Sequence, residues 1–493
     1  MGMKRVFSLF LALLMSASLL ACGNTAEETT AVDTAAETVE TETETQFMMD
    51  NLPEDLDFAG AEVNTFGWEE VAIVEFFAEE MNGDVVNDAV FQRNQVVEER
   101  LNVALNYTLA PGNNANHQTW ANTVVGSTMA GDGANDIVAG YSMAPTILAF
   151  KRVLIDLVTL DYLDFEMPWW PSSLIDEAVC GGKLYFCSGD ISTNMISMLY
   201  CMFYNKTVAT NQGLEDFYLL VKNGTWALDK MIELASGCYV DINGDGSKDP
   251  GDAFGYVVQP VYIDPFFFAS GLRTTVQDEN GLHVLSPEFS GERTQELLVK
   301  LVEMFKTDAM FLAGYTAEGY EHVRNAFMED RALFFDTEIS YAVNYLRQSE
   351  TSYGILPIPK YEESQKEYST IMSFPYTLYG VPVDAKDPDM SAAVMECLAS
   401  ESYRTVSPAL FEIALKVKFS QDMESAEMYD IIRSSATFDF GRIFCTNLDS
   451  LTFSMFRDSV NSGNTNWMST FQGKKKTLET KLAAVVDALV AEQ

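Results

Sequence analysis

Histidine and positive charge are scarce in this chain. The three histidines, His117, His283 and His322, lie far apart in the sequence. The chain therefore has too few histidines, too far apart in the sequence, to favour a zinc centre or a histidine-dependent catalytic triad. Lysine and arginine together number 31, against 72 aspartates and glutamates, for a formal net charge of −41. Because such a surface repels phosphates, nucleic acid is excluded as an expected partner.

Cysteine is also sparse, and no CxxC pair occurs. The chain has seven cysteines at irregular spacings, one of them Cys22 near the N-terminus. The even number that remains permits disulfides in an exported protein, but a body of this size does not need them, so buried free thiols are an equal alternative. Cys180 and Cys187 flank a short Gly-Gly turn and strand, and they are the one pair for which we consider a bridge.

One hydrophobic run stands out, from Val6 to Ala21, directly after Lys4 and Arg5. It is shorter than the roughly 20 residues that span a bilayer. Its basic residues lie only on the N-terminal side, which is typical of a secretory signal peptide at 1–21. The run ends in Leu-Leu-Ala-Cys and resembles the signal of bacterial lipoproteins. That resemblance implies cleavage before Cys22, attachment of diacylglycerol to its thiol and acylation of its freed amine, with palmitate as an expected chain.

Leu20 departs from the lipoprotein pattern, which has a smaller residue there. The alternative is an ordinary secretory signal with an inert Cys22. Residues 22–50 then form an acidic linker with no basic residue and little to bury, so we expect a disordered spacer. Signal, anchor and spacer together predict an exported protein held by lipid on the extracytoplasmic face of the bacterial cell membrane.

The body that follows has about 440 residues, more than one core usually organises, so we expect two lobes. Its first part alternates strands and helices in the order expected of a parallel α/β sheet. The expected elements are a strand at 61–67, a helix at 84–101 capped by Asp84, a strand at 103–109, a helix at 118–129 and a strand at 136–139. Ligands of such sheets bind beyond the carboxyl ends of strands, which directs attention to Trp68, Glu69 and Tyr141.

The α/β pattern continues to the C-terminus. Further strands are expected at 183–186, 199–204, 331–336 and, broken by prolines, 353–359. Helices are expected at 228–235, 293–305 and 478–489, where apolar residues recur at helical spacing. No repeat of solenoid length is present.

Residues 241–252 match a calcium-binding loop of the EF-hand type. Oxygen ligands recur where such a loop requires them, and Gly246 lies at its sharp turn. The expected ligands are Asp241, Asn243, Asp245, the carbonyl of Ser247, Asp249 and Asp252. Asp252 stands where an EF-hand has Glu, which makes the loop resemble the dockerin variant. We expect Ca²⁺ to stabilise the fold; the alternative is an acidic turn without an ion.

Several sequence strings, taken in order, resemble the substrate-binding lipoproteins of ABC importers, in family 1 of the extracellular solute-binding proteins. The strings are 93–103, 182–185 with 203–206, 221–226, 330–334 and 355–360. The resemblance covers the whole mature body. It implies an α/β fold of the two-lobed periplasmic-binding-protein type II, or Venus-flytrap, class, with hinge crossovers and a central ligand cleft. It also implies that ABC permease transmembrane subunits recognise the closed form, that the protein is a monomer, and that it is no enzyme.

By the same resemblance, lobe boundaries are expected at 51–185 plus 336–370 for the N-terminal lobe and 186–335 plus 371–493 for the C-terminal lobe. The implied ligand is a sugar or oligosaccharide, which needs aromatic faces for its rings and carboxylates or amides for its hydroxyls. Candidate ligand-binding residues are Trp68, Glu69, Tyr141, Asp190, Tyr262, Asp264, Phe266, Asp336, Glu338 and Tyr376. For each aromatic residue the alternative is core packing, and for each carboxylate a solvated surface position.

Two other functions stay open. A peptide or another small solute would use the same architecture, and the sequence does not decide between ligand classes. A surface-anchored glycoside hydrolase would need a pair of carboxylates about 5–9.5 Å apart, and no local motif marks such a pair.

Overall fold

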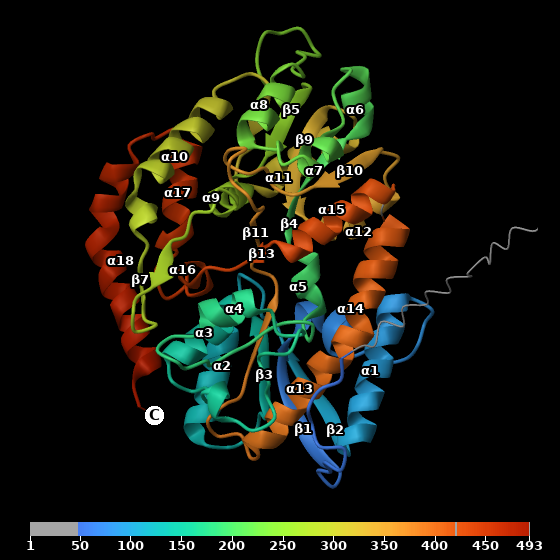
Figure 1. Ribbon diagram of the computed structural model, residues 1–493, viewed down its shortest axis with the longest axis vertical. Coiled ribbons are helices and arrows are strands. Elements are labelled where there is room, and N and C mark those ends of the chain that lie inside the picture. The colour runs from blue at the N-terminus through green and yellow to red at the C-terminus, as the bar shows by residue number, and fades with distance from the viewer. Residues whose placement is uncertain (1–47, 420–421, 493) are drawn as a thin grey trace, which may run out of the picture. The chain divides into compact units, whose positions relative to one another are not determined.

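Two β-sheets organise the folded chain. A computed structural model describes residues 48–419 and 422–492, and Figure 1 shows the two sheets one above the other, each with its own helices. We call the part built on the four-stranded sheet lobe 1 and the part built on the five-stranded sheet lobe 2. The expected signal peptide, Cys22 and the spacer as far as residue 47 lie outside the described residues.

The sheet of lobe 1 has the strand order β12-β3-β1-β2. Its strands are β1 (Ala61–Trp68), β2 (Val103–Ala110), β3 (Ile137–Tyr141) and β12 (Thr377–Gly380). β1 pairs in parallel with β2 and β3, and β12 pairs antiparallel with β3. Since a tight turn cannot join parallel neighbours, helices carry the chain between them. These are α1 (Val85–Leu101), between β1 and β2, and α2 (His117–Ala130), between β2 and β3.

Helix α1 begins as the sequence predicts. The Asp84 carboxylate accepts hydrogen bonds from the backbone N–H groups of Val86 and Asn87 at 3.0 and 3.2 Å, which satisfies two donors of the first turn. Val97 and Leu101 recur at helical spacing and are fully buried. The cap fixes where α1 begins, and its apolar face packs into the core of lobe 1.

The sheet of lobe 2 has the order β10-β4-β9-β5-β8. Its strands are β4 (Tyr200–Asn205), β5 (Phe254–Val258), β8 (Met310–Leu312), β9 (Ala332–Glu338) and β10 (Tyr353–Leu356). β9 is central, as its apolar run predicts, and pairs antiparallel with β4 and parallel with β5. β10 lies at the edge and ends before Pro357, because proline cannot donate to a strand ladder.

The other elements fall into three groups. Lobe 1 also holds α3 (Met143–Phe150), α13 (Pro388–Arg404), η1 (Glu69–Val71), the π-helical turn η2 (Ala72–Phe76) and η3 (Leu157–Thr159). Lobe 2 also holds α6 (Lys206–Asn211), α7 (Phe217–Lys222), α8 (Leu228–Ser236), α9 (Asp264–Ala269), α10 (Glu292–Phe305), α11 (Ala317–Met328), α12 (Ser340–Asn344), α15 (Met423–Ser434), α17 (Leu451–Ser462), η4 (Pro260–Ile263), η5 (Pro287–Ser290), η6 (Leu346–Gln348) and the hairpin β6 (Thr275–Gln277) with β7 (His283–Leu285). Elements between the lobes are α4 (Ser172–Ala178), α5 (Thr193–Ser197), β11 (Thr370–Ile371), α14 (Val406–Pro408), η7 (Ala409–Phe419), β13 (Ala436–Thr437), α16 (Phe440–Ile443) and α18 (Trp467–Val490).

The chain crosses between the two sheets three times. It leaves lobe 1 after Cys187, which still bridges to Tyr379 of β12, and enters lobe 2 at β4. It returns between β10 and β12, where β11 pairs with β13 in a separate two-stranded sheet. It crosses again between α13, which packs on α1, and α15, which packs on β10. These crossovers form the hinge region between the lobes.

The sheets divide the chain at places other than the expected lobe boundaries. The range 336–370 was expected in the N-terminal lobe, but β10 lies within it and belongs to the sheet of lobe 2. The range 371–493 was expected in the other lobe, but β12 belongs to the sheet of lobe 1. The strand expected at 183–186 is also absent: Lys183 and Cys187 each form only a single bridge. Distant pairing partners decide these assignments, and short apolar runs do not reveal them.

The cysteines of the described residues are all free. Each of the six is buried, including Cys180 and Cys187, so no bridge joins that pair. Burial raises the pKa of Cys187 well above its usual value, which keeps this thiol neutral and unreactive.

Candidate ligand-binding site

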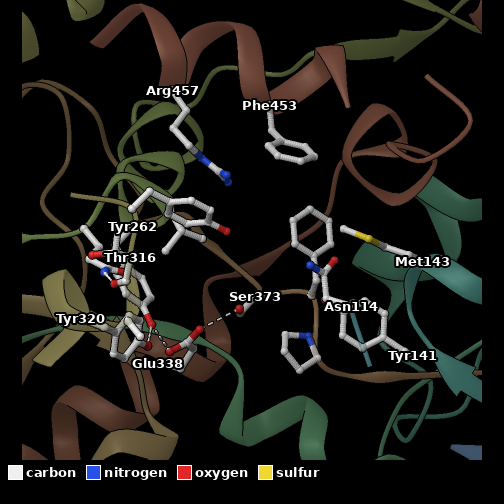
Figure 2. Close-up of a pocket in the computed structure, with 16 residues that line it drawn as sticks. Asn114, Tyr141, Met143, Tyr262, Thr316, Tyr320, Glu338, Ser373, Phe453 and Arg457 are labelled. Atoms are coloured by element: carbon white, nitrogen blue, oxygen red, sulfur yellow. Dashed lines mark hydrogen bonds between the residues drawn. The ribbon is translucent and has the colours of Figure 1, made fainter. Parts of the chain in front are cut away.

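A cavity of about 490 Å³ lies between the two lobes, at the ends of strands from both sheets (Figure 2). This volume is in the range of small-molecule sites. Its lining residues are Asn114, Tyr141, Met143, Gln259, Val261, Tyr262, Tyr315, Thr316, Ala317, Tyr320, Glu338, Ser373, Phe374, Pro375, Phe453 and Arg457. Aromatic rings and a few polar groups predominate, and both are needed to hold a polar ring-shaped ligand.

Strand ends of both sheets supply much of the lining. Tyr141 is the last residue of β3, Glu338 is the last residue of β9, and Tyr262 follows β5 in η4. The carboxyl ends of strands are where α/β sheets bind ligands, because the chain turns away there and leaves a crevice. Helix α17 adds Phe453 and Arg457, which lie four residues apart and so share one face of that helix.

Glu338 is the polar centre of the cavity floor. Its carboxylate accepts hydrogen bonds from the hydroxyls of Tyr262 at 3.1 Å, Thr337 at 2.9 Å and Ser373 at 2.8 Å. The Tyr262 and Tyr320 hydroxyls also contact each other. A carboxylate offers about four acceptor positions, so one remains for a hydroxyl of a ligand. Ser373 lies in the crossover before β12, so this network joins lobe 2 to the hinge.

Arg457 is the polar group of the opposite wall. Its Nε donates to Asp264 Oδ1 at 2.8 Å, and its guanidinium forms an ion pair with the same carboxylate. Asp264 is buried and also binds Nη1 of Arg442 at 2.9 Å. Within the described residues Nη1 of Arg457 donates no hydrogen bond, and its guanidinium lies 4.6 Å from the centroid of the Phe453 ring. Arg457 is therefore fixed in direction with a donor left for a ligand oxygen.

Aromatic side chains line both sides of the cavity. Tyr141 meets Trp68 edge to face, with ring centroids 5.4 Å apart. Burial raises the pKa of Tyr141 well above its usual value, so its phenol stays a neutral donor. Tyr315 is 67% exposed at the rim, a high exposure for a large ring. These rings are suited to contact the C–H faces of a sugar.

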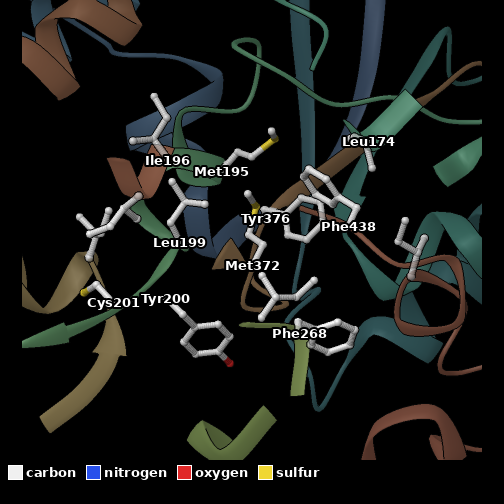
Figure 3. Packing of buried hydrophobic residues seen from close by; sticks show 14 of the residues in the cluster. Leu174, Met195, Ile196, Leu199, Tyr200, Cys201, Phe268, Met372, Tyr376 and Phe438 are labelled. Atoms are coloured by element: carbon white, nitrogen blue, oxygen red, sulfur yellow. The ribbon is translucent and has the colours of Figure 1, made fainter. Parts of the chain in front are cut away.

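The hinge segments contribute to a cluster of buried apolar residues (Figure 3). Leu199 and Met372, from two different crossovers, form a backbone bridge and are buried at 2% and 3% exposure. Met195 of α5 and Phe438, which follows β13, belong to the same cluster. The hinge segments are therefore packed as core, which fixes the position of Ser373 next to Met372.

Three of the ten candidate ligand residues line the cavity: Tyr141, Tyr262 and Glu338. Asp264 lies directly behind the wall and holds Arg457 in place instead. Asp264 lies where η4, which carries Tyr262, is followed by α9. The sequence therefore indicated the correct region of the chain, but it did not show which carboxylate faces the cleft.

The other candidates lie elsewhere. Trp68, Phe266 and Tyr376 are buried in the core and do not line the cavity. Asp336 is fully buried, where burial raises its pKa well above its usual value and Tyr256 donates to it at 2.8 Å. Asp336 and Glu338 are two residues apart and so share one face of β9. Asp336 lies inside the strand and is covered, whereas Glu338 is the last residue of the strand and reaches the cavity.

Two carboxylate candidates also miss the cavity. Asp190 forms an ion pair with Arg433 at 3.3 Å and a hydrogen bond with Ser407, both near the hinge. Glu69 is exposed in η1. Both follow the sequence rule of lying near strand ends or turns, but the rule does not say which way a side chain points.

The sequence did not indicate Arg457, Phe453, Asn114 and Ser373 as lining residues. Asn114 follows β2, and the rule that ligands bind beyond strand ends would have found it. Arg457 and Phe453 come from a helix more than one hundred residues after β9, and no local pattern connects that helix with the cleft.

The candidate calcium loop keeps its side chains close together. Asp241 accepts the backbone N–H groups of Gly244 and Gly246 at 2.7 and 2.8 Å, and Asp252 is fully buried. The Asn243 amide contacts the carboxylates of Asp245 and Asp249, each at 3.1 Å. Among the residues described, no group of three or more His, Cys, Asp or Glu side chains is placed to hold a metal ion.

Comparisons with known proteins identify the fold. No family model and no curated protein matches this sequence. Solved structures do match: the cyclic α-maltosyl-1,6-maltose binding protein of Arthrobacter globiformis has a TM-score of 0.58 at 12% identity, covering 86% of this chain and 99% of that one. The galacto-N-biose-/lacto-N-biose I-binding protein of a Bifidobacterium longum ABC transporter has a TM-score of 0.57 at 12% identity, covering 87% and 98%.

UgpB of Mycobacterium tuberculosis, solved with glycerophosphocholine, has a TM-score of 0.55 at 14% identity, covering 85% of this chain and 98% of that one. This chain has the fold of the extracellular solute-binding proteins. The two-lobed α/β architecture expected from the sequence is thereby confirmed. Within the part of the chain that the structure describes, no helix has both the length and the apolar composition to span a bilayer.

Proposed function

We propose that this protein captures a sugar or oligosaccharide outside the cell and delivers it to an ABC importer. The observation that carries the proposal is the cavity between the lobes, lined by Tyr141 of lobe 1 and by Tyr262, Glu338 and Arg457 of lobe 2. A ligand that touches both lobes favours their closed arrangement by its differential affinity. The permease transmembrane subunits would recognise that arrangement, and the binding protein acts as a monomer.

Carbohydrate is the favoured ligand because the cavity has the chemistry for it. Glu338 supplies an acceptor, Arg457 a donor, and Tyr141 and Tyr262 supply rings. Two of the similar structures are named for the oligosaccharides they bind. UgpB, with glycerophosphocholine, represents the other class, a small solute that is not a sugar.

A glycoside hydrolase is the less favoured alternative. Such enzymes require two carboxylates across the scissile bond. Among the described residues that line the cavity, Glu338 is the single carboxylate. Its three hydroxyl partners also occupy most of its acceptor positions, which suits binding better than proton transfer.

The test is a thermal-shift screen of the purified chain against a library of mono- and oligosaccharides, with dipeptides and glycerophosphodiesters as further sets. A hit is then measured by calorimetry and recovered for analysis. The proposal expects a carbohydrate hit that is recovered unchanged. Turnover of the hit would indicate an enzyme. A hit only among the dipeptides or the glycerophosphodiesters would show that the ligand is not a carbohydrate.

The anchor belongs to the same proposal. Lipidation of Cys22 would hold the binding protein at the membrane and raise its effective concentration near the permease. Growth with a clickable palmitate analogue should label the native chain and leave a Cys22→Ser variant unlabelled. Unlabelled native protein in the culture medium would instead show an ordinary secretory signal.

We also propose that the loop at 241–252 binds Ca²⁺. The loop offers oxygen donors throughout, the ligand type that Ca²⁺ prefers. The amide nitrogen of Asn243 contacts the carboxylates of both Asp245 and Asp249 at 3.1 Å, so these three side chains lie on one side of the loop. The ion would tie the loop between α8 and β5 and stabilise lobe 2.

A further inference from the structure

The C-terminal helix α18 extends from lobe 2 to lobe 1. It has 24 residues, and Figure 1 shows it at the left margin, running from beside α10 and α17 down to beside α3. Its first turns belong to lobe 2. The indole of Trp467 donates to the carbonyl of Phe289 at 2.6 Å, and the rings of Phe289 and Phe471 are 5.7 Å apart.

The last turn of α18 is held by lobe 1. The Tyr185 hydroxyl donates to the carbonyl of Leu489 at 2.7 Å. Lys183 Nζ donates to the carbonyls of Val490 and Ala491 at 3.1 and 2.8 Å. The final carbonyls of a helix lack partners within the helix, and a cation there also complements its dipole. Lobe 1 therefore caps a helix that starts in lobe 2.

The turn that carries Lys183 is shaped for this contact. Gly181 has a φ of +58°, and a Cβ there would lie 2.8 Å from a methyl group of Val490. Its backbone N–H donates to the carbonyl of Gly281, at the tip of the β6–β7 hairpin, at 2.9 Å. The end of α18 and the tip of a lobe 2 hairpin thus meet one turn of lobe 1.

These contacts lie apart from the covalent crossovers. In Figure 1 β11 and β13 lie near the centre and α14 to the right of them, whereas α18 is on the far left. A rotation of the lobes about the crossovers would therefore displace the end of α18 relative to Lys183 and Tyr185.

We propose that the last turn of α18 is a latch between the lobes, closed by Lys183 and Tyr185, and that separation of the lobes requires its release. The latch depends on the proposed function in one respect, because opening of the lobes serves ligand capture. The contacts that form the latch need no ligand. Hydrogen bonds to helix carbonyls are individually weak in water, so release is reversible.

The test measures the distance between the lobes without any ligand. Spin labels are placed at Met129→Cys on α2 and Leu219→Cys on α7, which are 73% and 53% exposed. The native cysteines of the described residues are buried and do not compete for the label; Cys22 is replaced by serine. Pulsed electron resonance then gives the distance distribution between the two lobes.

The variant is Lys183→Met with Tyr185→Phe, which removes the donors and keeps the side chains' bulk. Its matched control is Lys481→Met, which removes a lysine of α18 whose ion pair is with Asp449, before α17. The proposal expects a new, longer distance population in the double variant alone. An unchanged distribution in a double variant with normal circular dichroism overturns it. Should the double variant misfold, Tyr185→Phe alone gives the same comparison. A failed sugar screen leaves this result unaffected.

Discussion

At the scale of single residues, the site depends on how Arg457 is held. Asp264 binds both Arg457 and Arg442, so one carboxylate directs two guanidinium groups. A buried charge without a partner costs several kcal/mol of stability, so each of these three side chains has to keep its partner. Asp264 acts through Arg457 and is a positioning residue.

Substitution of Arg457 should weaken ligand binding. Arg457→Gln removes a charged donor, and hydrogen bonds to charged groups contribute about 1.5–3 kcal/mol, so affinity for the carbohydrate hit should fall roughly tenfold to a hundredfold. Calorimetry of that hit measures the change. Arg324→Gln is the matched control, because Arg324 likewise packs on an aromatic ring, that of Tyr345, but lies outside the cavity lining. Equal affinities of the native and Arg457→Gln proteins would show that Arg457 does not contribute to ligand binding.

A second buried acid links stability to pH. Burial raises the pKa of Glu396 to about 7, although the indole N–H groups of Trp169 and Trp170 donate to its carboxylate. The folded state thus holds this proton more tightly than the unfolded chain. The resulting stabilisation is complete below about pH 4.5 and is lost as the pH rises through about 7.

Glu396→Gln should therefore flatten the pH dependence of stability. Between pH 5 and pH 8 the native protein should lose up to about 3 kcal/mol of unfolding free energy through this group, and the variant should lack that loss. Urea unfolding at the two pH values measures it. Glu79→Gln, at an exposed position, is the control and should behave as native. Parallel curves for native and Glu396→Gln protein would contradict the assignment.

At the scale of elements, the sequence predicted more of the fold than of the site. Helix α1 was predictable because an aspartate cap and an apolar face act locally. The ranges that contain β10 and β12 were assigned to the wrong lobes because pairing joins residues far apart, such as Tyr379 with Ala139. The site shows the same limit. Strand ends indicated Tyr141 and Glu338, whereas Arg457 comes from a helix that only tertiary packing brings to the cleft.

The candidate calcium loop gives a prediction for one element. Addition of CaCl₂ to chelator-treated protein should raise its melting temperature, because a ligand that binds only the folded state stabilises it by mass action. Asp241→Asn should lose that shift. Asp278→Asn should keep it, since Asp278 accepts backbone N–H groups in a comparable turn of the β6–β7 hairpin. Equal melting temperatures in calcium and in EDTA would show that the loop binds no ion that matters to stability.

At the scale of the whole molecule, the excess of acids sets the response to salt. The net charge of −41 leaves most carboxylates without a basic partner, and their mutual repulsion opposes the compact state. The same repulsion disfavours association of two copies, in keeping with a monomer. Salt shortens the range of these interactions, from about 30 Å at 0.01 M to about 8 Å at 0.15 M.

The melting temperature should accordingly rise by a few degrees between about 0.01 M and 0.15 M NaCl at neutral pH. Differential scanning calorimetry at fixed calcium concentration measures the shift. Near the isoelectric point, at about pH 4.2, the net charge vanishes and so should most of the salt effect. A shift of the same size at both pH values would mean that salt acts through apolar burial, because that term does not depend on net charge. Sedimentation in both salts completes the test, since repulsion predicts a single monomeric species in each.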